Sequence, residues 1–203
     1  MKLPVFLALL AYLSGSIPTG FLLFKIKEKR DIRDFGSQST GATNIFRIKG
    51  AWWALAVLVL DVAKGFIPAL ICRAYLHPPF LALAISFLSV VGHCFPFAIG
   101  FRGGKGVATS FGVMAAFSWQ ALLIGAVVFI LVVAITRYVS AGSLLASLLF
   151  IPMLYFISHD PYLTVVAVFY TVLIWVRHRA NLRRLLAGQE SRLGQKMGRA
   201  KNT

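Results

Sequence analysis

Residues 107–136 read VATSFGVMAAFSWQALLIGAVVFILVVAIT, and this run contains no acidic or basic side chain. Runs of about 20 apolar residues are typical of transmembrane helices. Hydrophobic residues make up 59% of the 203-residue chain, and its mean hydropathy is +0.80. The sequence therefore predicts an all-α, polytopic integral membrane protein. The further apolar runs lie at about residues 3–24, 52–72, 79–101, 140–157 and 162–176.

The run 107–136 is longer than one membrane span needs. Thirty helical residues would extend about 45 Å, whereas the hydrocarbon core is about 30 Å thick. A break near Ser118 would divide the run into two short helices or a re-entrant pair, giving about seven transmembrane helices in total. A single tilted helix is the alternative.

The basic residues predict the orientation in the membrane. The formal net charge is +15, and the basic residues cluster in 25–50 and 177–203. Both segments are expected on the cytoplasmic side. Seven spans then place the N-terminus outside, the C-terminus in the cytoplasm and the loop 100–106 inside. Because the charges lie between or beyond apolar spans, they argue against a nucleic-acid partner.

The N-terminal run resembles a signal peptide, since Lys2 precedes an apolar stretch. The apolar stretch resumes through residues 17–24, which favours a retained first span over a cleaved signal. No internal repeat is evident, so residues 1–203 are expected to form one domain. Cys72 and Cys94 form no metal-ligand pattern and imply no disulfide framework.

The loop GFRGGKG (100–106) combines glycines with two basic residues. It is not a P-loop, which needs a glycine five positions before the Gly-Lys pair and Ser or Thr after it. Backbone N–H groups in a turn can nevertheless bind an anion, and the N-terminus of the next helix favours one. The sequence predicts a phosphate site here, with candidates Arg102, Gly103, Gly104, Lys105, Gly106 and Thr109.

The stretch GSQSTGATNIFR (36–47) is rich in small polar residues, and its last residue is an arginine. The planar guanidinium of arginine can bind a phosphate with two hydrogen bonds. This pattern favours anion binding over a solvated loop that caps the next helix. The candidates are Ser37, Gly41, Thr43, Asn44 and Arg47. SGSIPTG (14–20) interrupts the first span, and it is either a helix kink or the lining of a cavity.

The stretch RHRANLRRLLAGQE (177–190) follows the last apolar run. Its spacing places four polar side chains on part of one helical face: Arg177, His178, Asn181 and Arg184. A basic amphipathic helix on anionic lipid is the alternative. That alternative fits Arg183, Lys196, Arg199 and Lys201, but it does not require a histidine and an asparagine three residues apart.

Other polar residues inside apolar runs carry less information. His93 can serve either function or structure, and Ser143 can reach the site from the end of RYVSAGS (137–143). Asp61 and Lys64 lie three residues apart on one helix. Intramembrane charges are functional candidates, but these two can pair with each other, so a structural role is expected.

Several catalytic patterns are absent from the sequence. No aspartate lies five positions after a histidine, which excludes the acyltransferase signature built on that pair. Gly-x-Ser-x-Gly and a Ser-His-Asp set are also absent. No carboxylate cluster is suited to catalytic magnesium, and we expect neither a metal ion nor a cofactor.

Four motifs in order resemble those of the bacterial acyl-phosphate:glycerol-3-phosphate acyltransferases. They run from Ser14 to Glu190 and read SGSIPTG, GS-x-x-x-GATN-x-x-R, GH-x-FP-x(5)-RGGKGVAT and RHR-x-N-L-x-RLL-x-G-x-E. LDVAKGFIP (60–68) also resembles the second-span pattern of this family. Ser39 stands where the family commonly has Asn, and Arg102 stands where it commonly has Lys.

The resemblance implies a seven-span enzyme of the bacterial inner membrane with its site on the cytoplasmic side. Such an enzyme transfers an acyl group from acyl phosphate, not from acyl-CoA or acyl carrier protein, to glycerol 3-phosphate. The products are 1-acyl-glycerol 3-phosphate (lysophosphatidic acid) and phosphate, in the first acylation of phospholipid synthesis. Besides these substrates and membrane lipid, no obligate protein partner is implied.

The residue types suit this reaction, because two anions must lie close together at a membrane surface. Lys105, Arg102 and the loop N–H groups would stabilise the leaving phosphate. Glycerol 3-phosphate would be positioned by Arg47, Ser37, His178 and Asn181. The proton of the attacking hydroxyl could pass to His178, to His93 or to an oxygen of the acyl phosphate.

Two other classes of protein remain open from the sequence. A transporter of organic phosphates could use the same basic site, since broken helices and anion-binding helix ends also occur there. A lipid-binding scaffold would leave the glycine-rich loops without a purpose. Ester formation in detergent, without a sealed membrane, separates an enzyme from a transporter.

Overall fold

The computed structural model describes residues 2–195, which fold into helices joined by turns and loops. No strand occurs within these residues, so the all-α prediction is confirmed. The predicted basic residues Lys196, Arg199 and Lys201 lie outside the described part of the chain. The helices are α1 (Lys2–Gly15), α2 (Thr19–Glu28), η1 (Ile32–Asp34), α3 (Ala42–Lys49), α4 (Ala51–Tyr75), α5 (Pro79–Cys94), η2 (Phe97–Ile99), α6 (Val107–Phe117), α7 (Trp119–Thr136), α8 (Val139–Ser158), α9 (Pro161–Arg177) and α10 (Arg179–Leu186).

Several of these helices have the length and composition of membrane spans. Within residues 2–195, five segments qualify: Lys2–Glu28, Ala51–Tyr75, Pro79–Ile99, Trp119–Thr136 and Val139–Ser158. Helices α9 and α10, bent by 63° at their junction, make a sixth when they are taken as one span. Helix α6 is apolar but has only 11 residues. The count of seven spans therefore stays a prediction.

Helix α7 shows how the molecule suits a lipid environment. Of its 18 residues, only Ala121 and Gly125 are buried inside the protein. Large apolar side chains such as Ile130 and Ile135 are exposed. A continuous apolar surface of this kind is unfavourable in water, but it matches the hydrocarbon core of a bilayer, where the helix satisfies its own backbone hydrogen bonds.

The predicted break near Ser118 is confirmed. Helix α6 ends at Phe117 and α7 begins at Trp119, so the alternative of one tilted helix is wrong. The Ser118 hydroxyl accepts a hydrogen bond from the N–H of Ala121 at 3.2 Å, which caps α7. At about 1.5 Å per residue, α7 is about 27 Å long, close to the hydrocarbon thickness.

The SGSIPTG stretch breaks the first span between α1 and α2. The Lys64 ammonium donates to the Ile17 carbonyl at 2.8 Å, and the Ser14 hydroxyl donates to the Lys64 carbonyl at 3.2 Å. The first bond satisfies a carbonyl that the break leaves outside the helix. The second satisfies a carbonyl within α4 that has no helical partner, because Pro68, four residues on, lacks an N–H. Residues 14–20 are not part of the lining of the cavity described below, and the stretch forms a break between two helices.

A buried polar cluster joins this break to α4. Asp61 and Lys64 form an ion pair at 2.8 Å, and both side chains are almost fully buried. The Thr19 hydroxyl donates a hydrogen bond to Asp61. The expected pairing of these two charges is confirmed. Truncating one partner would leave the other charge buried and unpaired, which is the costly case.

Helices α4 and α6 pack closely because each has a glycine at the contact. A Cβ on Gly65 would lie 2.2 Å from the Thr109 carbonyl oxygen, and one on Gly112 would lie 2.1 Å from the Val62 carbonyl oxygen. Small residues allow this approach between helices in membranes. The short α6 is thereby held against α4, with its first residue next to the loop 100–106.

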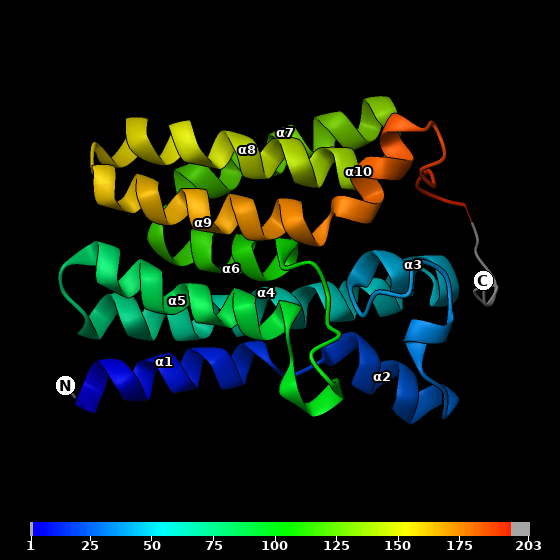
Figure 1. The fold of residues 1–203 in the computed structure, drawn as a ribbon, viewed down its shortest axis with the longest axis horizontal. Coiled ribbons are helices and arrows are strands. Elements are labelled where there is room, and N and C mark those ends of the chain that lie inside the picture. The colour runs from blue at the N-terminus through cyan, green and yellow to red at the C-terminus, as the bar shows by residue number, and fades with distance from the viewer. Residues whose placement is uncertain (1, 196–203) are drawn as a thin grey trace.

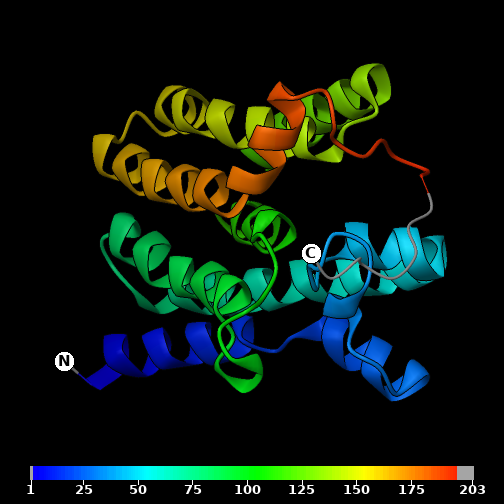
Figure 2. The same cartoon turned by 45° about the vertical axis from the view of Figure 1, so that its right-hand side comes forward.

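The figures show how this packing places the polar segments. Helices α1, α4 and α5 form one group and α7, α8 and α9 another, with α6 between them (Figure 1; Figure 2). Helices α2, α3 and α10 gather at the end of the molecule opposite the N-terminus (Figure 1). The glycine-rich and basic segments that are far apart in sequence therefore meet at one end.

Candidate active site

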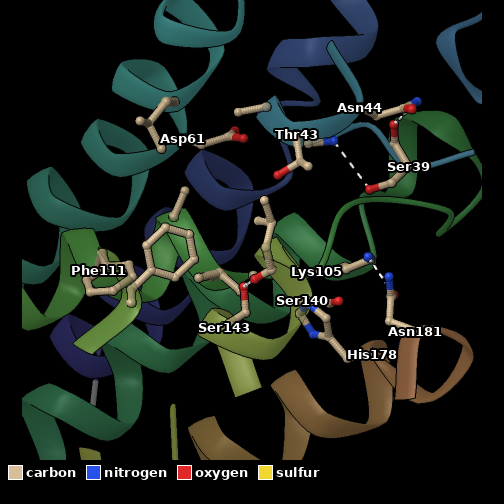
Figure 3. Close-up of a pocket in the computed structure, with 18 of the residues that line it drawn as sticks. Ser39, Thr43, Asn44, Asp61, Lys105, Phe111, Ser140, Ser143, His178 and Asn181 are labelled. Atoms are coloured by element: carbon tan, nitrogen blue, oxygen red, sulfur yellow. Dashed lines mark hydrogen bonds between the residues drawn. The ribbon is translucent and has the colours of Figure 1, made fainter. Parts of the chain in front are cut away.

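A cavity of about 450 Å³ lies where α3, α4, α6, α7, α8 and α10 converge. One part of its lining is polar and the other is apolar. Figure 3 shows Lys105, His178 and Asn181 on one side of the cavity and Phe111 on the other. The polar part includes Ser37, Ser39, Thr43, Arg47, Lys105, Ser140, Ser143, His178, Asn181 and Glu190, and the apolar part includes Leu58, Val62, Phe111, Leu122, Ala126, Phe129 and Ile130.

Lys105 directs its ammonium group into the polar part of the cavity. Its Nζ donates to the Asn181 side-chain oxygen at 2.7 Å (Figure 3). Burial disfavours the charged form and lowers the pKa of Lys105 to about 8, although the Glu190 carboxylate opposes this. The neighbouring guanidinium groups of Arg184, Arg47 and Arg177 contribute to this lowering of the pKa.

Glu190 fixes the orientation of Asn181. Its carboxylate accepts hydrogen bonds from Asn181 Nδ2 at 2.6 Å, from the Ser140 hydroxyl at 2.8 Å and from Arg184 Nε at 2.7 Å. Burial alone would raise the pKa of Glu190, but these bonds outweigh it and lower the pKa. Because the amide N–H₂ faces Glu190, the amide oxygen faces Lys105.

Glu190 and Ser140 were not among the predicted site residues. Glu190 closes the fourth motif, and it is the one acidic residue in the basic stretch 177–195. That isolation is the signal that could have identified it, because a lone carboxylate among arginines is poised to accept hydrogen bonds from them. Its partner Ser140 comes from α8, and only the fold brings the two together.

Arg47 enters the cavity from α3. One of its terminal nitrogens donates to the Ser191 carbonyl at 3.2 Å. Its buried Nε has no hydrogen-bond partner within residues 2–195. A buried guanidinium N–H without a partner is costly. Ser37, Gly41 and Thr43 line the cavity beside Arg47, as does Ser39.

Asn44 holds the loop that leads into α3. Its side-chain oxygen accepts the Ser37 N–H at 2.8 Å, and its Nδ2 donates to the Phe35 carbonyl at 3.0 Å and to the Ser39 carbonyl at 2.9 Å. The side chain is almost fully buried. Asn44 therefore shapes the loop that presents Ser37, and its amide groups are already occupied.

His178 sits at the bend between α9 and α10. Its Nδ1 lies 2.8 Å from the Ile174 carbonyl oxygen. A carbonyl can only accept, so Nδ1 carries the proton, and Nε2 of the neutral ring keeps a lone pair. His178 lines the cavity (Figure 3), where Nε2 is available as an acceptor for a substrate hydroxyl.

His93 has a carboxylate neighbour that the sequence did not reveal. Its Nδ1 lies 3.6 Å from Asp61 Oδ1, which is too long for a hydrogen bond. Asp61 is already paired with Lys64. A Cβ on Gly104 would lie 2.0 Å from His93 Nε2, so the other edge of the ring supports the loop before Lys105.

Part of the predicted phosphate loop does not face the cavity. In the structure, the N–H groups of Gly103 and Gly104 donate to the carbonyls of Cys94 at 3.2 Å and His93 at 3.1 Å. The expected binding of phosphate by these two N–H groups therefore stays a prediction that this geometry does not support. Arg102 is exposed and outside the cavity lining.

The remaining predicted residues divide between the cavity and its surroundings. Gly106 lines the cavity and precedes α6. Ser143 also lines it, from α8. Thr109 is fully buried beside Gly65 and does not line the cavity. Arg184 binds Glu190 from the rim.

The described residues contain no cluster of three or more His, Cys, Asp or Glu side chains that could hold a metal ion. The two carboxylates in the polar part of the cavity, Asp61 and Glu190, are paired with Lys64 and Arg184. The polar part also offers an ammonium group, a guanidinium group and neutral hydrogen-bond donors. This set is suited to binding phosphate groups. The apolar part suits a hydrocarbon chain. Together they form a candidate site for anionic, lipid-like ligands.

Comparison with known proteins agrees with this class. A family model described as "Glycerol-3-phosphate acyltransferase" matches residues 5–188. The chain is 42% identical to a glycerol-3-phosphate acyltransferase of Nitrobacter winogradskyi over 91% of this chain and 93% of that protein. It is 40% identical to one of Brucella canis over 91% of this chain and 90% of that protein. The chain belongs to the glycerol-3-phosphate acyltransferase family, as its motifs predicted.

Two crystal structures of PlsY (YgiH), an integral membrane glycerol 3-phosphate acyltransferase, have the same fold. The glycerol 3-phosphate form is 38% identical with a TM-score of 0.90, covering 94% of this chain and 96% of that chain. The lysophosphatidic acid form is 37% identical with a TM-score of 0.87, covering 95% and 96%. The expectation of a polytopic integral membrane protein is confirmed.

Proposed function

We propose that the protein transfers a fatty acyl group from acyl phosphate to the 1-hydroxyl of sn-glycerol 3-phosphate. The products are 1-acyl-glycerol 3-phosphate and inorganic phosphate, in the first acylation of phospholipid synthesis. The observation that carries this proposal is the cavity itself, which joins the cationic pair Lys105 and Arg47 to an apolar groove. Membership of the family and the likeness to PlsY in its substrate and product forms support it.

The cationic groups divide naturally between the two phosphates. Lys105 would bind the phosphate of the donor, and Arg47 with Ser37 would bind that of glycerol 3-phosphate. Asn181 and His178 lie next to Lys105 and would orient the attacking hydroxyl. The apolar part of the cavity would take the acyl chain, so that the carbonyl carbon lies at the boundary between the two parts.

The chemistry is a single acyl transfer. The glycerol oxygen forms a bond to the carbonyl carbon, and the bond from that carbon to the phosphate oxygen breaks with its electron pair on phosphate. The leaving phosphate oxygens gain negative charge, which the Lys105 ammonium stabilises in the transition state. Holding both reactants in place lowers the barrier by roughly 7–11 kcal/mol.

The hydroxyl proton needs an acceptor. We favour an oxygen of the acyl phosphate, which leaves as phosphate carrying that proton. His178 Nε2 is the alternative, because its ring is neutral. Glu190 favours an imidazolium there, but burial and the Lys105 ammonium disfavour one. No carboxylate is hydrogen bonded to the ring within the described residues. The hydrogen bond of Nδ1 goes to the Ile174 carbonyl instead.

We place the protein in the bacterial inner membrane as a single multi-pass domain with seven spans. The basic segments around α3 and α10 favour the cytoplasm for the site and the outer side for the N-terminus. Arg47, Lys105 and Arg184 all belong to this end of the molecule. A cysteine introduced near the N-terminus should react with an impermeant reagent from outside, and one introduced in 187–189 should not.

A direct assay tests the proposed function. Purified protein in detergent receives glycerol 3-phosphate with acyl phosphate, with acyl-CoA or with acyl carrier protein. We expect lysophosphatidic acid from acyl phosphate alone. Efficient turnover with acyl-CoA would remove the donor assignment. Binding of glycerol 3-phosphate without ester formation would instead indicate an organic-phosphate transporter.

A further inference from the structure

Arg177, the last residue of α9, binds the loop that carries Lys105. Its Nε donates to the Gly104 carbonyl at 3.1 Å, and its Nη2 donates to the Gly103 carbonyl at 3.0 Å. Its guanidinium carbon lies 5.1 Å from the centre of the Phe95 ring. Two adjacent carbonyls are thus held by one rigid, planar group that also packs on an aromatic face.

The opposite side of the same two residues is bound to α5. The Gly103 and Gly104 N–H groups donate to the Cys94 and His93 carbonyls. Both N–H groups and both carbonyls of this dipeptide are therefore hydrogen bonded, although it belongs to no helix. A Cβ on Gly103 would lie 2.1 Å from the His93 carbonyl oxygen, so the backbone is pressed against α5.

Lys105 follows this dipeptide directly, and its ammonium meets Asn181 on α10. Arg177 and Asn181 lie on either side of the bend at His178. The segment 177–181 therefore fixes both the backbone that precedes Lys105 and the ammonium group of Lys105. A cytoplasmic topology signal would need only a positive charge, and a lysine cannot bind two carbonyls in this planar arrangement.

We propose that Arg177 is a positioning residue for Lys105: it clamps Gly103 and Gly104 against the end of α5, so that the Lys105 ammonium is held at the leaving phosphate. This inference rests on the proposed function for its catalytic consequence, but the clamp itself can be tested without catalysis. Misplacing a catalytic group by about 1 Å can reduce a rate about 100-fold.

The native cysteines report on the clamp. Cys94 Sγ lies beneath the loop, since a Cβ on Gly106 would be 3.1 Å from it. Cys72 is also buried, near the other end of the bundle on α4. Loosening the loop should expose Cys94 while Cys72 stays protected, whereas general loss of the fold should expose both.

The experiment compares Arg177→Lys and Arg177→Gln with Arg183→Gln. Arg183 is an exposed basic residue six positions along and serves as the matched control. Reaction with a small thiol reagent in detergent, followed by mass spectrometry, gives the rate at each cysteine. We expect Cys94 to react at least about tenfold faster in both Arg177 variants, with Cys72 unchanged. Arg183→Gln should behave as the wild type.

The same proteins are then assayed with acyl phosphate and glycerol 3-phosphate. Both Arg177 variants should lose about tenfold or more in kcat, with KM for glycerol 3-phosphate within about twofold. Arg177→Lys keeps the positive charge. A lower kcat in this variant therefore reports on the planar contact of Arg177 with the two carbonyls alone.

Four results would overturn the inference. They are wild-type kcat in Arg177→Lys, a lower kcat with Cys94 still protected, exposure of Cys94 with normal kcat, and equal exposure of both cysteines. If the wild type transfers no acyl group, the proposed function fails, and the thiol rates alone decide whether the clamp exists.

Discussion

The loop 100–106 and the segment 177–190 contribute to the site in opposite ways. The loop is dense in glycine and was expected to bind phosphate through its backbone. In the structure, the N–H groups of Gly103 and Gly104 are hydrogen bonded to carbonyls of α5. Of the two basic residues in this loop, Lys105 directs its side chain into the cavity and Arg102 does not. The segment 177–190 has scattered polar residues, yet His178, Asn181 and Glu190 all reach the cavity.

This difference teaches how a glycine-rich stretch should be interpreted. A glycine shows that something approaches the backbone closely, but it does not show what approaches. Around residue 104 the close neighbour is the His93 ring, not a ligand. In 177–190 the informative feature is the chemistry of the side chains, because an amide and a carboxylate among arginines have no purpose as a topology signal.

Of the variants that test this comparison, those at Lys105 should have the largest effect on kcat. Lys105→Ala removes the ammonium that stabilises the leaving phosphate, so kcat should fall on the order of 100- to 1000-fold. Lys105→Arg should restore activity only partly, because the larger planar group aims its donors differently. The measurement is steady-state kinetics on well-folded protein in detergent. A normal kcat with only a raised KM would mean that Lys105 merely gathers substrate.

The dependence of activity on pH follows from the burial of Lys105. The pKa of Lys105 is lowered to about 8, and only the protonated form can stabilise the phosphate. Above that pH, kcat/KM of the free enzyme should fall about tenfold per pH unit. Lys105→Arg should lack this alkaline decline, because a guanidinium stays charged. An alkaline decline of the same shape in both proteins would assign it to another group.

Breaks between helices are easier to predict from the sequence than contacts within the site, for a physical reason. Helix breaks depend on local sequence: Ser118 can cap α7, and the glycine and proline of SGSIPTG favour an interruption, so both breaks were found. The site depends on contacts between distant segments. Glu190 meets Ser140 across 50 positions in sequence, and Arg177 reaches Gly103 across 74. No pattern within either segment contains these contacts.

Gly104→Ala separates packing from phosphate binding in the loop. A Cβ at this position would lie 2.0 Å from His93 Nε2, and the buried ring has little room to move. Overpacking of this kind costs about 1–3 kcal/mol of stability. We expect a lower Tm and about a tenfold loss of kcat from displacement of Lys105. If stability is unchanged and only KM rises, the backbone there binds substrate after all.

Glu190→Gln tests the segment 177–190 at Glu190, which was not among the predicted site residues. Glutamine can still accept one or two of the hydrogen bonds, but it removes the negative charge that raises the pKa of Lys105. The alkaline decline of kcat/KM should therefore move to lower pH, and kcat should fall about tenfold as Asn181 loses its fixed orientation. A pH profile identical to that of the wild type would contradict the proposed contact chain from Glu190 through Asn181 to Lys105.

Arg102→Gln should have the smallest effect, and it completes the comparison within the loop itself. Arg102 and Lys105 are both basic and three residues apart, and the motif alone gives no reason to separate them. In the fold, Arg102 is exposed and outside the cavity, where water and salt screen its charge. We expect kcat and KM to remain within about twofold of the wild type, measured beside Lys105→Ala at low and high salt.

A loss of kcat approaching that of Lys105→Ala would show that the loop rearranges when substrate binds and brings Arg102 to the phosphate. A twofold or smaller change that disappears at high salt would show that Arg102 acts only as part of the positive surface around the site.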